Sequence, residues 1–249
     1  MIDWVLYVLL GAAMGTLGGL FGIGGGLIAI PALGVLFGLE QQLAQGTALV
    51  MMVPNIVLAL WRYHQRTRVQ WRQALPLVLS GFVFAWLGSL LAVGLDARSM
   101  RQGFVVFLLM LAAFNGVQMF GTRHTTVREL NQPWPRMASL GAVCGMLGGI
   151  FGVGSGVVLT PVLTGLFGAS QVVAQGLALA LAVPSSAITL LTYAVHQHVD
   201  WSIGLPMALG GLLSVSWGVK LAYALPQRLL RTLFCIFLLL CAALLAVKS

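Results

Sequence analysis

Charged side chains are scarce in this sequence of 249 residues. Only 7% of the residues are Asp, Glu, Lys or Arg, whereas 59% are apolar. A water-soluble domain carries roughly a quarter of its residues as charged groups, because polar side chains must cover its surface. The composition therefore excludes a soluble globular protein and predicts a chain embedded in lipid. Its length accommodates about eight spans of roughly 20 residues.

Acidic residues are the rarest charged groups, and no acidic residue falls inside a long apolar run. The five carboxylates map to loops or to the ends of runs: Asp3, Glu40, Asp96, Glu129 and Asp200. Many pumps move protons along carboxylates within the membrane. Such a relay has no candidate residue in this sequence.

Metal-binding and catalytic patterns are missing as well. Cys144, Cys235 and Cys241 fall within apolar runs without metal-ligand spacing, and we interpret them as packing residues. The pair His196 and His198 could contact a metal ion, but a solvated loop is the simpler interpretation. No Ser/His/Asp combination supports catalysis. We therefore expect no enzyme activity, no metal and no cofactor.

Basic residues outnumber acidic ones by 13 to five, which gives a net charge of +8. Most of them lie between apolar runs, as in the cytoplasmic loops of membrane proteins. They form no stripe beside exposed aromatic residues, so we expect no nucleic-acid partner. The N-terminal residues Met1 to Trp4 lack the basic start of a cleaved signal peptide, and we expect them to begin the first span.

The second half of the sequence repeats the first. A glycine-rich stretch that begins at Gly11 matches one that begins at Gly141, and the register continues without a gap to Pro54 and Pro184. Duplication of this kind is common in secondary transporters. We predict an all-α polytopic membrane protein with about eight segments, divided into a first repeat (1–120), a hydrophilic linker (121–136) and a second repeat (137–249). The apolar runs are 4–37, 44–61, 74–95 and 102–120, followed by 137–167, 174–193, 204–225 and 232–247.

The relative orientation of the two repeats is open at this level. If the first run of each repeat crosses the membrane once, the repeats are parallel; if that run is broken and folds back, they are inverted. The loop 62–72 carries four arginines, whereas its counterpart 192–202 carries no Lys or Arg. By the positive-inside rule this difference weakly favours inversion. Either arrangement places 62–72 and 121–136 in the cytoplasm.

Glycines concentrate at equivalent places in the two first runs. Gly11, Gly15, Gly18 and Gly22 share one helix face, as do their counterparts from Gly141 to Gly152, and small residues in such a stripe favour helix-on-helix packing.

The glycine clusters that follow predict a broken helix near the membrane midplane, because each glycine costs about 1 kcal/mol relative to alanine. The restarted helix would direct free N–H groups into a cavity, and two such ends would bind an anion. A packing kink is the alternative. The candidate residues are Gly22, Gly24, Gly25, Gly26, Gly152, Gly154, Ser155 and Gly156.

The second apolar run of each repeat carries a polar motif at its start and further polar residues near its middle. Polar groups at membrane depth face either a wet cavity or a partner helix. The candidates are Gln45, Gly46, Thr47 and Asn55 in the first repeat, and Gln175, Gly176, Ser185 and Ser186 in the second. Because proline removes a backbone hydrogen bond, helix breaks are expected at Pro31, Pro54, Pro161 and Pro184.

Together these motifs resemble those of the sulfite exporter TauE/SafE family, over nearly the whole chain. The resemblance rests on Gly18-Gly19-Leu-Phe21-Gly22-Ile-Gly24-Gly25-Gly26 with the following Pro31, on Ala44-Gln45-Gly46-Thr47, and on their recurrence in the second half. The second copy departs from the pattern, since Ser155 replaces the middle glycine and Leu177 replaces the threonine.

The resemblance implies a multi-pass permease or exporter of a bacterial-type inner membrane. Its substrate would be sulfite, a sulfonate or a related small organic anion, moved without nucleotide hydrolysis along the glycine breaks and the Gln-Gly-Thr region. The partners expected are this anion and the lipid bilayer, and the small-residue faces are compatible with a homodimer. A passive anion channel and a non-transporting membrane scaffold are the alternatives.

Overall fold

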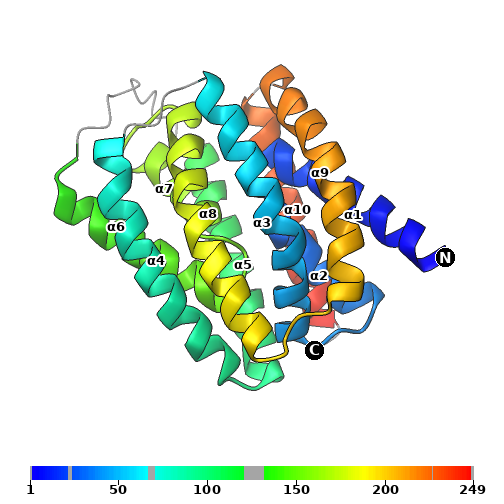
Figure 1. Ribbon diagram of the computed structural model, residues 1–249. Coiled ribbons are helices and arrows are strands. Elements are labelled where there is room, and N and C mark those ends of the chain that lie inside the picture. The colour runs from blue at the N-terminus through cyan, green and yellow to red at the C-terminus, as the bar shows by residue number, and fades with distance from the viewer. Residues whose placement is uncertain (1, 22–23, 67–70, 121–131, 226, 248–249) are drawn as a thin grey trace.

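The computed structural model describes residues 2–21, 24–66, 71–120, 132–225 and 227–247. Within these residues the chain forms ten α-helices and no strand (Figure 1). The helices are α1 (Ile2–Phe21), α2 (Gly26–Leu36), α3 (Gln41–Arg66), α4 (Trp71–Val93), α5 (Ala97–Phe120), α6 (Trp134–Phe151), α7 (Gly156–Gly165), α8 (Gln171–Val195), α9 (Trp201–Ala224) and α10 (Gln227–Val247).

Most of the described helices have the length and composition of membrane spans. Six of them, α1, α3, α4, α5, α8 and α9, are long and apolar enough to cross a bilayer. Helices α2 and α7 are apolar but contain only 11 and 10 residues, which is about half the thickness of a hydrocarbon core. Large apolar side chains such as Leu209 and Leu213 are exposed on the surface. The chain is therefore an all-helical, multi-pass membrane protein.

The first predicted run is a helical hairpin. Helix α2 runs back along α1, because the ring of Phe37 lies 5.4 Å from that of Tyr7 and Gly25 adjoins Met14 and Gly18. Helices α6 and α7 repeat the break and the return, with Ser155 adjoining Gly148. The helix breaks predicted from the glycine clusters are confirmed in both halves.

The first helix of each half packs against the other half. Helix α1 lies along α9, and α6 lies along α4, at opposite ends of the molecule in Figure 1. Gly11 adjoins the backbone of Met207 and Gly15 that of Gly211, so α1 and α9 run parallel. The missing side chains let the two backbones approach closely. The predicted helix-on-helix role of the glycine stripe is confirmed for Gly11 and Gly15, whereas Gly18 faces Gly25 of its own hairpin.

The interface between α6 and α4 is equivalent to that between α1 and α9, with the first helix now from the second half and its partner from the first half. Gly141 adjoins Leu77 and Gly145 adjoins Gly81, so α6 and α4 also run parallel. Gly148 differs from the predicted stripe, because it faces the return of its own hairpin at Ser155. Reciprocal contacts of this kind are the pattern of two units related by a twofold axis.

Helices α3 and α8 cross the centre of the molecule in opposite directions. Gln45, near the start of α3, accepts a hydrogen bond of 2.8 Å from the hydroxyl of Tyr193, near the end of α8. Helix α3 also packs on α9, and α8 packs on α4. The equivalent helices of the two halves therefore point in opposite directions.

The four mid-run prolines do not end helices. Pro31, Pro54, Pro161 and Pro184 all lie inside helices that continue past them, so the predicted helix breaks at these prolines are wrong. Each proline removes one backbone hydrogen bond, and packing against neighbouring helices retains the helical path. The interruptions occur instead at the glycines, where the chain must reverse its direction.

Candidate functional site

The two hairpin turns meet at the centre of the molecule, beside Met52. A Cβ atom on Gly26 would lie 3.6 Å from the carbonyl oxygen of Gly152, and one on Gly154 would lie 3.1 Å from Cε of Met52. Met52 is fully buried near the middle of the 26-residue helix α3. The two breaks therefore share one location, at half the depth of the long helices.

Backbone conformation explains why glycine occupies the two turns. Gly24 and Gly154 occupy equivalent positions, with φ angles of 70° and 77°, in the left-handed region that other residues avoid. There is also little room for a side chain, because a Cβ on Gly24 would overlap Ile56. Both turns depend on glycine for their conformation, and the first turn also depends on it for space.

Each break leaves a helix N-terminus without a side-chain cap. The N-cap residues are Gly25 for α2 and Ser155 for α7, and neither makes a side-chain capping bond. Ser155 instead pairs its hydroxyl with that of Ser185, at 2.7 Å. The first amides of a helix have no partner within the helix, and that end carries about half a positive charge. Two such ends adjoin the volume around Met52.

Several buried polar groups of α3 and α8 have no hydrogen-bond partner in the described part of the chain. They include Nε2 of Gln45, both polar atoms of the Asn55 amide, and the hydroxyl of Ser186. A Cβ on Gly154 would lie 3.3 Å from the Ser186 hydroxyl, and one on Gly152 would lie 3.1 Å from Cβ of Gln45. An unpaired buried group costs about 1–3 kcal/mol, so Nε2 of Gln45 and the Ser186 hydroxyl, which lie beside the turns, are available as donors to a ligand.

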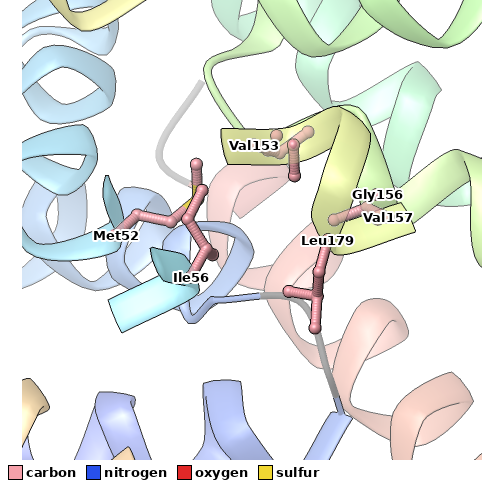
Figure 2. Close-up of a pocket in the computed structure, with 8 residues that line it drawn as sticks. Met52, Ile56, Val153, Gly156, Val157 and Leu179 are labelled. Atoms are coloured by element: carbon pink, nitrogen blue, oxygen red, sulfur yellow. The ribbon is translucent and has the colours of Figure 1, made fainter. Parts of the chain in front are cut away.

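The cavity between the turns is small and mostly apolar. Its volume is about 10 Å³, which is room for about one water molecule and too little for an oxyanion. Figure 2 shows Met52 and Ile56 of α3 on one side and residues of the second hairpin and α8 on the other. The lining residues are Met52, Ile56, Val153, Gly154, Gly156, Val157, Leu179 and Ala182. In this structure the space between the turns is therefore too small to hold the predicted ligand.

The Gln-Gly-Thr motif holds the start of α3 against the turn between α8 and α9. The hydroxyl of Thr47 accepts a 3.0 Å hydrogen bond from the backbone N–H of Asp200, and Gly46 adjoins the carbonyl of His198. Tyr193, which donates to Gln45, also lies 3.2 Å from the carbonyl oxygen of Ile150. The motif therefore fixes one end of α3. Of its three residues, Gln45 is the one that also adjoins a glycine turn, at Gly152.

The structure groups most, but not all, of the predicted site residues. The turns bring together Gly24, Gly25, Gly26, Gly152, Gly154, Ser155, Gly156, Ser185 and Ser186, with Gln45 beside them. Asn55 faces Gly211 on α9 and does not line the cavity. Gln175 and Gly176 are buried at the start of α8. Gly22 lies outside the described residues.

Sequence reasoning missed the apolar lining of the cavity. Met52 and Ala182 occupy equivalent positions, each two residues before a mid-run proline, and both are buried. Their side chains resemble any other core residue, so only their position next to a repeated proline could have indicated a role.

Comparison with known proteins identifies relatives along almost the whole chain. Residues 7–245 match the model of a family described as Sulfite exporter TauE/SafE. Two probable membrane transporter proteins of Xylella fastidiosa strains are 29% and 31% identical; the alignments cover 91% and 86% of this chain and 87% and 81% of the relatives. A probable membrane transporter protein of Methanocaldococcus jannaschii is 27% identical, and its alignment covers 64% of this chain and 60% of that relative.

Proposed function

The chain belongs to the sulfite exporter TauE/SafE family, and on that premise we propose that it transports a small anion between its two halves. The substrate class is sulfite, a sulfonate or a related organosulfur anion. The matched relatives are named as transporters. The observation that carries the proposal is the meeting of two uncapped helix N-termini beside Met52.

The central site would bind an anion without a buried Lys or Arg. Helix N-termini bind oxyanions through backbone N–H groups and the positive end of the dipole. The unpaired Nε2 of Gln45 and the hydroxyl of Ser186 supply two further donors. Because the present cavity of about 10 Å³ holds no more than a water molecule, binding requires the hairpins and Met52 to move apart.

We infer a membrane topology of inverted repeats from the direction of the helices. Helices α3, α4, α5, α8, α9 and α10 would cross the membrane, whereas the hairpins α1–α2 and α6–α7 would enter from opposite sides and return. Helix α1 is long enough to cross alone, but because α2 returns along it, both ends of the hairpin would lie on one side of the membrane. The basic end of α3 would face the cytoplasm of a bacterial-type inner membrane.

Flux into proteoliposomes tests the proposal directly. Purified protein should move radiolabelled sulfite or a labelled sulfonate faster than empty liposomes do, and the rate should saturate with concentration. A rate that rises without saturation would support a passive channel, in which no conformational cycle limits the flux. If the protein neither binds nor moves sulfite, sulfonates or small carboxylates, the proposal fails and a scaffold role is favoured.

A further inference from the structure

A second pocket, remote from the glycine turns, lies between the C-terminal parts of α3 and α9. Its volume is about 100 Å³, and it is lined by Arg62, Gln65, Ser216, Val219 and Lys220. Two of these five side chains are cationic and none is acidic. The pocket therefore offers two positive charges and two neutral polar groups to a ligand.

The lipid-facing surface of α9 places this pocket at the level of lipid headgroups. Leu205, Leu209 and Leu213 are exposed at intervals of four residues, and the same face continues through Trp217, which is 70% exposed, to Leu221, three residues before the end of α9. Residues spaced by four share one helix face. Tryptophan is enriched where a membrane protein passes from hydrocarbon to headgroups. Lys220 lies within one turn of this tryptophan.

Within the described residues, the two cations of the pocket contact the rings of Trp61 and Trp217 and no carboxylate. The guanidinium carbon of Arg62 lies 5.5 Å from the ring centre of Trp61, and Nζ of Lys220 lies 5.4 Å from that of Trp217. Contacts of this kind orient a cation without neutralising it. Both charges remain available to an anion at the membrane surface.

We propose that this pocket binds the phosphate group of an anionic phospholipid, with the acyl chains along the exposed leucines of α9. Phosphate accepts hydrogen bonds from Arg and Lys, and basic pockets between membrane helices bind anionic headgroups on the cytoplasmic side. A lipid is favoured over a free anion because the pocket adjoins the leucine face and an exposed tryptophan. This inference does not depend on the transported substrate.

A titration of the purified protein in detergent tests the proposal. The probes are dihexanoyl phosphatidylglycerol, the matching phosphatidylcholine, inorganic phosphate and sulfite, and the readout is the shift of the thermal unfolding midpoint, which reports ligand affinity. Phosphatidylglycerol should bind at least about tenfold more tightly than phosphatidylcholine. Equal affinity for the two lipids would overturn the proposal, as would equal protection by inorganic phosphate; sulfite, which is expected to bind between the two halves, is the control for a ligand outside this pocket.

Variants then locate the binding. The double substitution Arg62→Gln with Lys220→Gln should weaken phosphatidylglycerol binding about 30-fold, because each cation near the surface contributes about a factor of five. Arg136→Gln, an exposed arginine on a helix outside the pocket, should retain the wild-type affinity. Arg62→Lys with Lys220→Arg, which keeps both charges, should retain most of it. Undiminished binding in the glutamine double variant would refute the assignment.

Discussion

At the scale of single residues, the centre of this protein is defined by what its glycines allow. Both glycine turns are left-handed, a side chain at Gly24 would overlap Ile56 and Met52, and one at Gly154 would crowd the end of Met52. A leucine at either position would be strained by about 1–2 kcal/mol from its φ angle alone, and it would enter the space around Met52.

Replacement of Gly154 by Leu should therefore abolish transport while the protein still inserts into the membrane, and Gly24→Leu should do the same. The measurement is proteoliposome flux normalised to folded protein. Gly116→Leu is the matched control, because a Cβ at that helical glycine would meet nothing within 4 Å. Normal flux in a well-expressed Gly154→Leu variant would contradict a site at the turns.

The neighbouring serines Ser185 and Ser186 have different surroundings, which predict a structural role for Ser185 and a binding role for Ser186. Ser185 contacts Ser155 and donates to the carbonyl oxygen of Leu181 at 2.8 Å, whereas the Ser186 hydroxyl is buried without a partner. Loss of a satisfied hydrogen bond costs about 1 kcal/mol, whereas loss of an unpaired group costs little.

We expect Ser186→Ala to leave the thermal unfolding midpoint unchanged or raised, and to raise the KM for the anion about three- to tenfold by removing one donor. Ser185→Ala should instead lower the midpoint. The two readouts are the midpoint in detergent and the concentration dependence of flux. An unchanged KM in Ser186→Ala would show that this hydroxyl does not reach the substrate.

At the scale of elements, the contact between α3 and the α8–α9 turn is asymmetric between the halves. Thr47 accepts a hydrogen bond from the backbone of Asp200, but the equivalent residue at the start of α8 is Leu177, whose side chain has no acceptor. The start of α8 therefore has no threonine hydroxyl with which to accept an equivalent hydrogen bond.

Thr47→Val should loosen this end of α3 without disturbing the glycine turns. The backbone N–H of Asp200 would lose its acceptor, so its hydrogen exchange should accelerate about fivefold or more, as expected for the loss of about 1 kcal/mol. Exchange measured by mass spectrometry over 196–203 reports the change. Thr189→Val removes a hydroxyl that bonds only within α8 and should not affect this turn. Unchanged exchange in Thr47→Val would argue against the contact.

At the scale of the whole molecule, the proposed inverted repeats would place the equivalent loops 62–72 and 192–202 on opposite faces of the membrane. In a background without native cysteines, a cysteine at Gln197 should be labelled by a membrane-impermeant reagent from outside. A cysteine at Gln65, an exposed residue near the end of α3, should be labelled only after the cytoplasmic side is opened. Labelling of both positions from the same side would support parallel repeats.

Local chemistry made much of this protein predictable from its sequence. The shortage of charge indicated a lipid environment, and the cost of clustered glycines in a helix located both breaks, from Gly24 to Gly26 and from Gly152 to Gly156. The helix breaks predicted at the prolines were wrong. A proline weakens a helix by removing one hydrogen bond, but packing against neighbouring helices decides whether the helix continues. The apolar lining at Met52 could not be predicted, since its chemistry matches that of any core residue.

The sequence by itself determined the membrane class, the duplication and the positions of the helix breaks, because each follows from composition or from residues that disfavour a helix locally. Only the tertiary structure decided that each first run folds back on itself, that each half packs on the other, and that both turns meet at one small cavity. These features depend on which surfaces face each other across long sequence separations. A glycine reveals that a neighbour can approach closely, but it does not reveal which neighbour does.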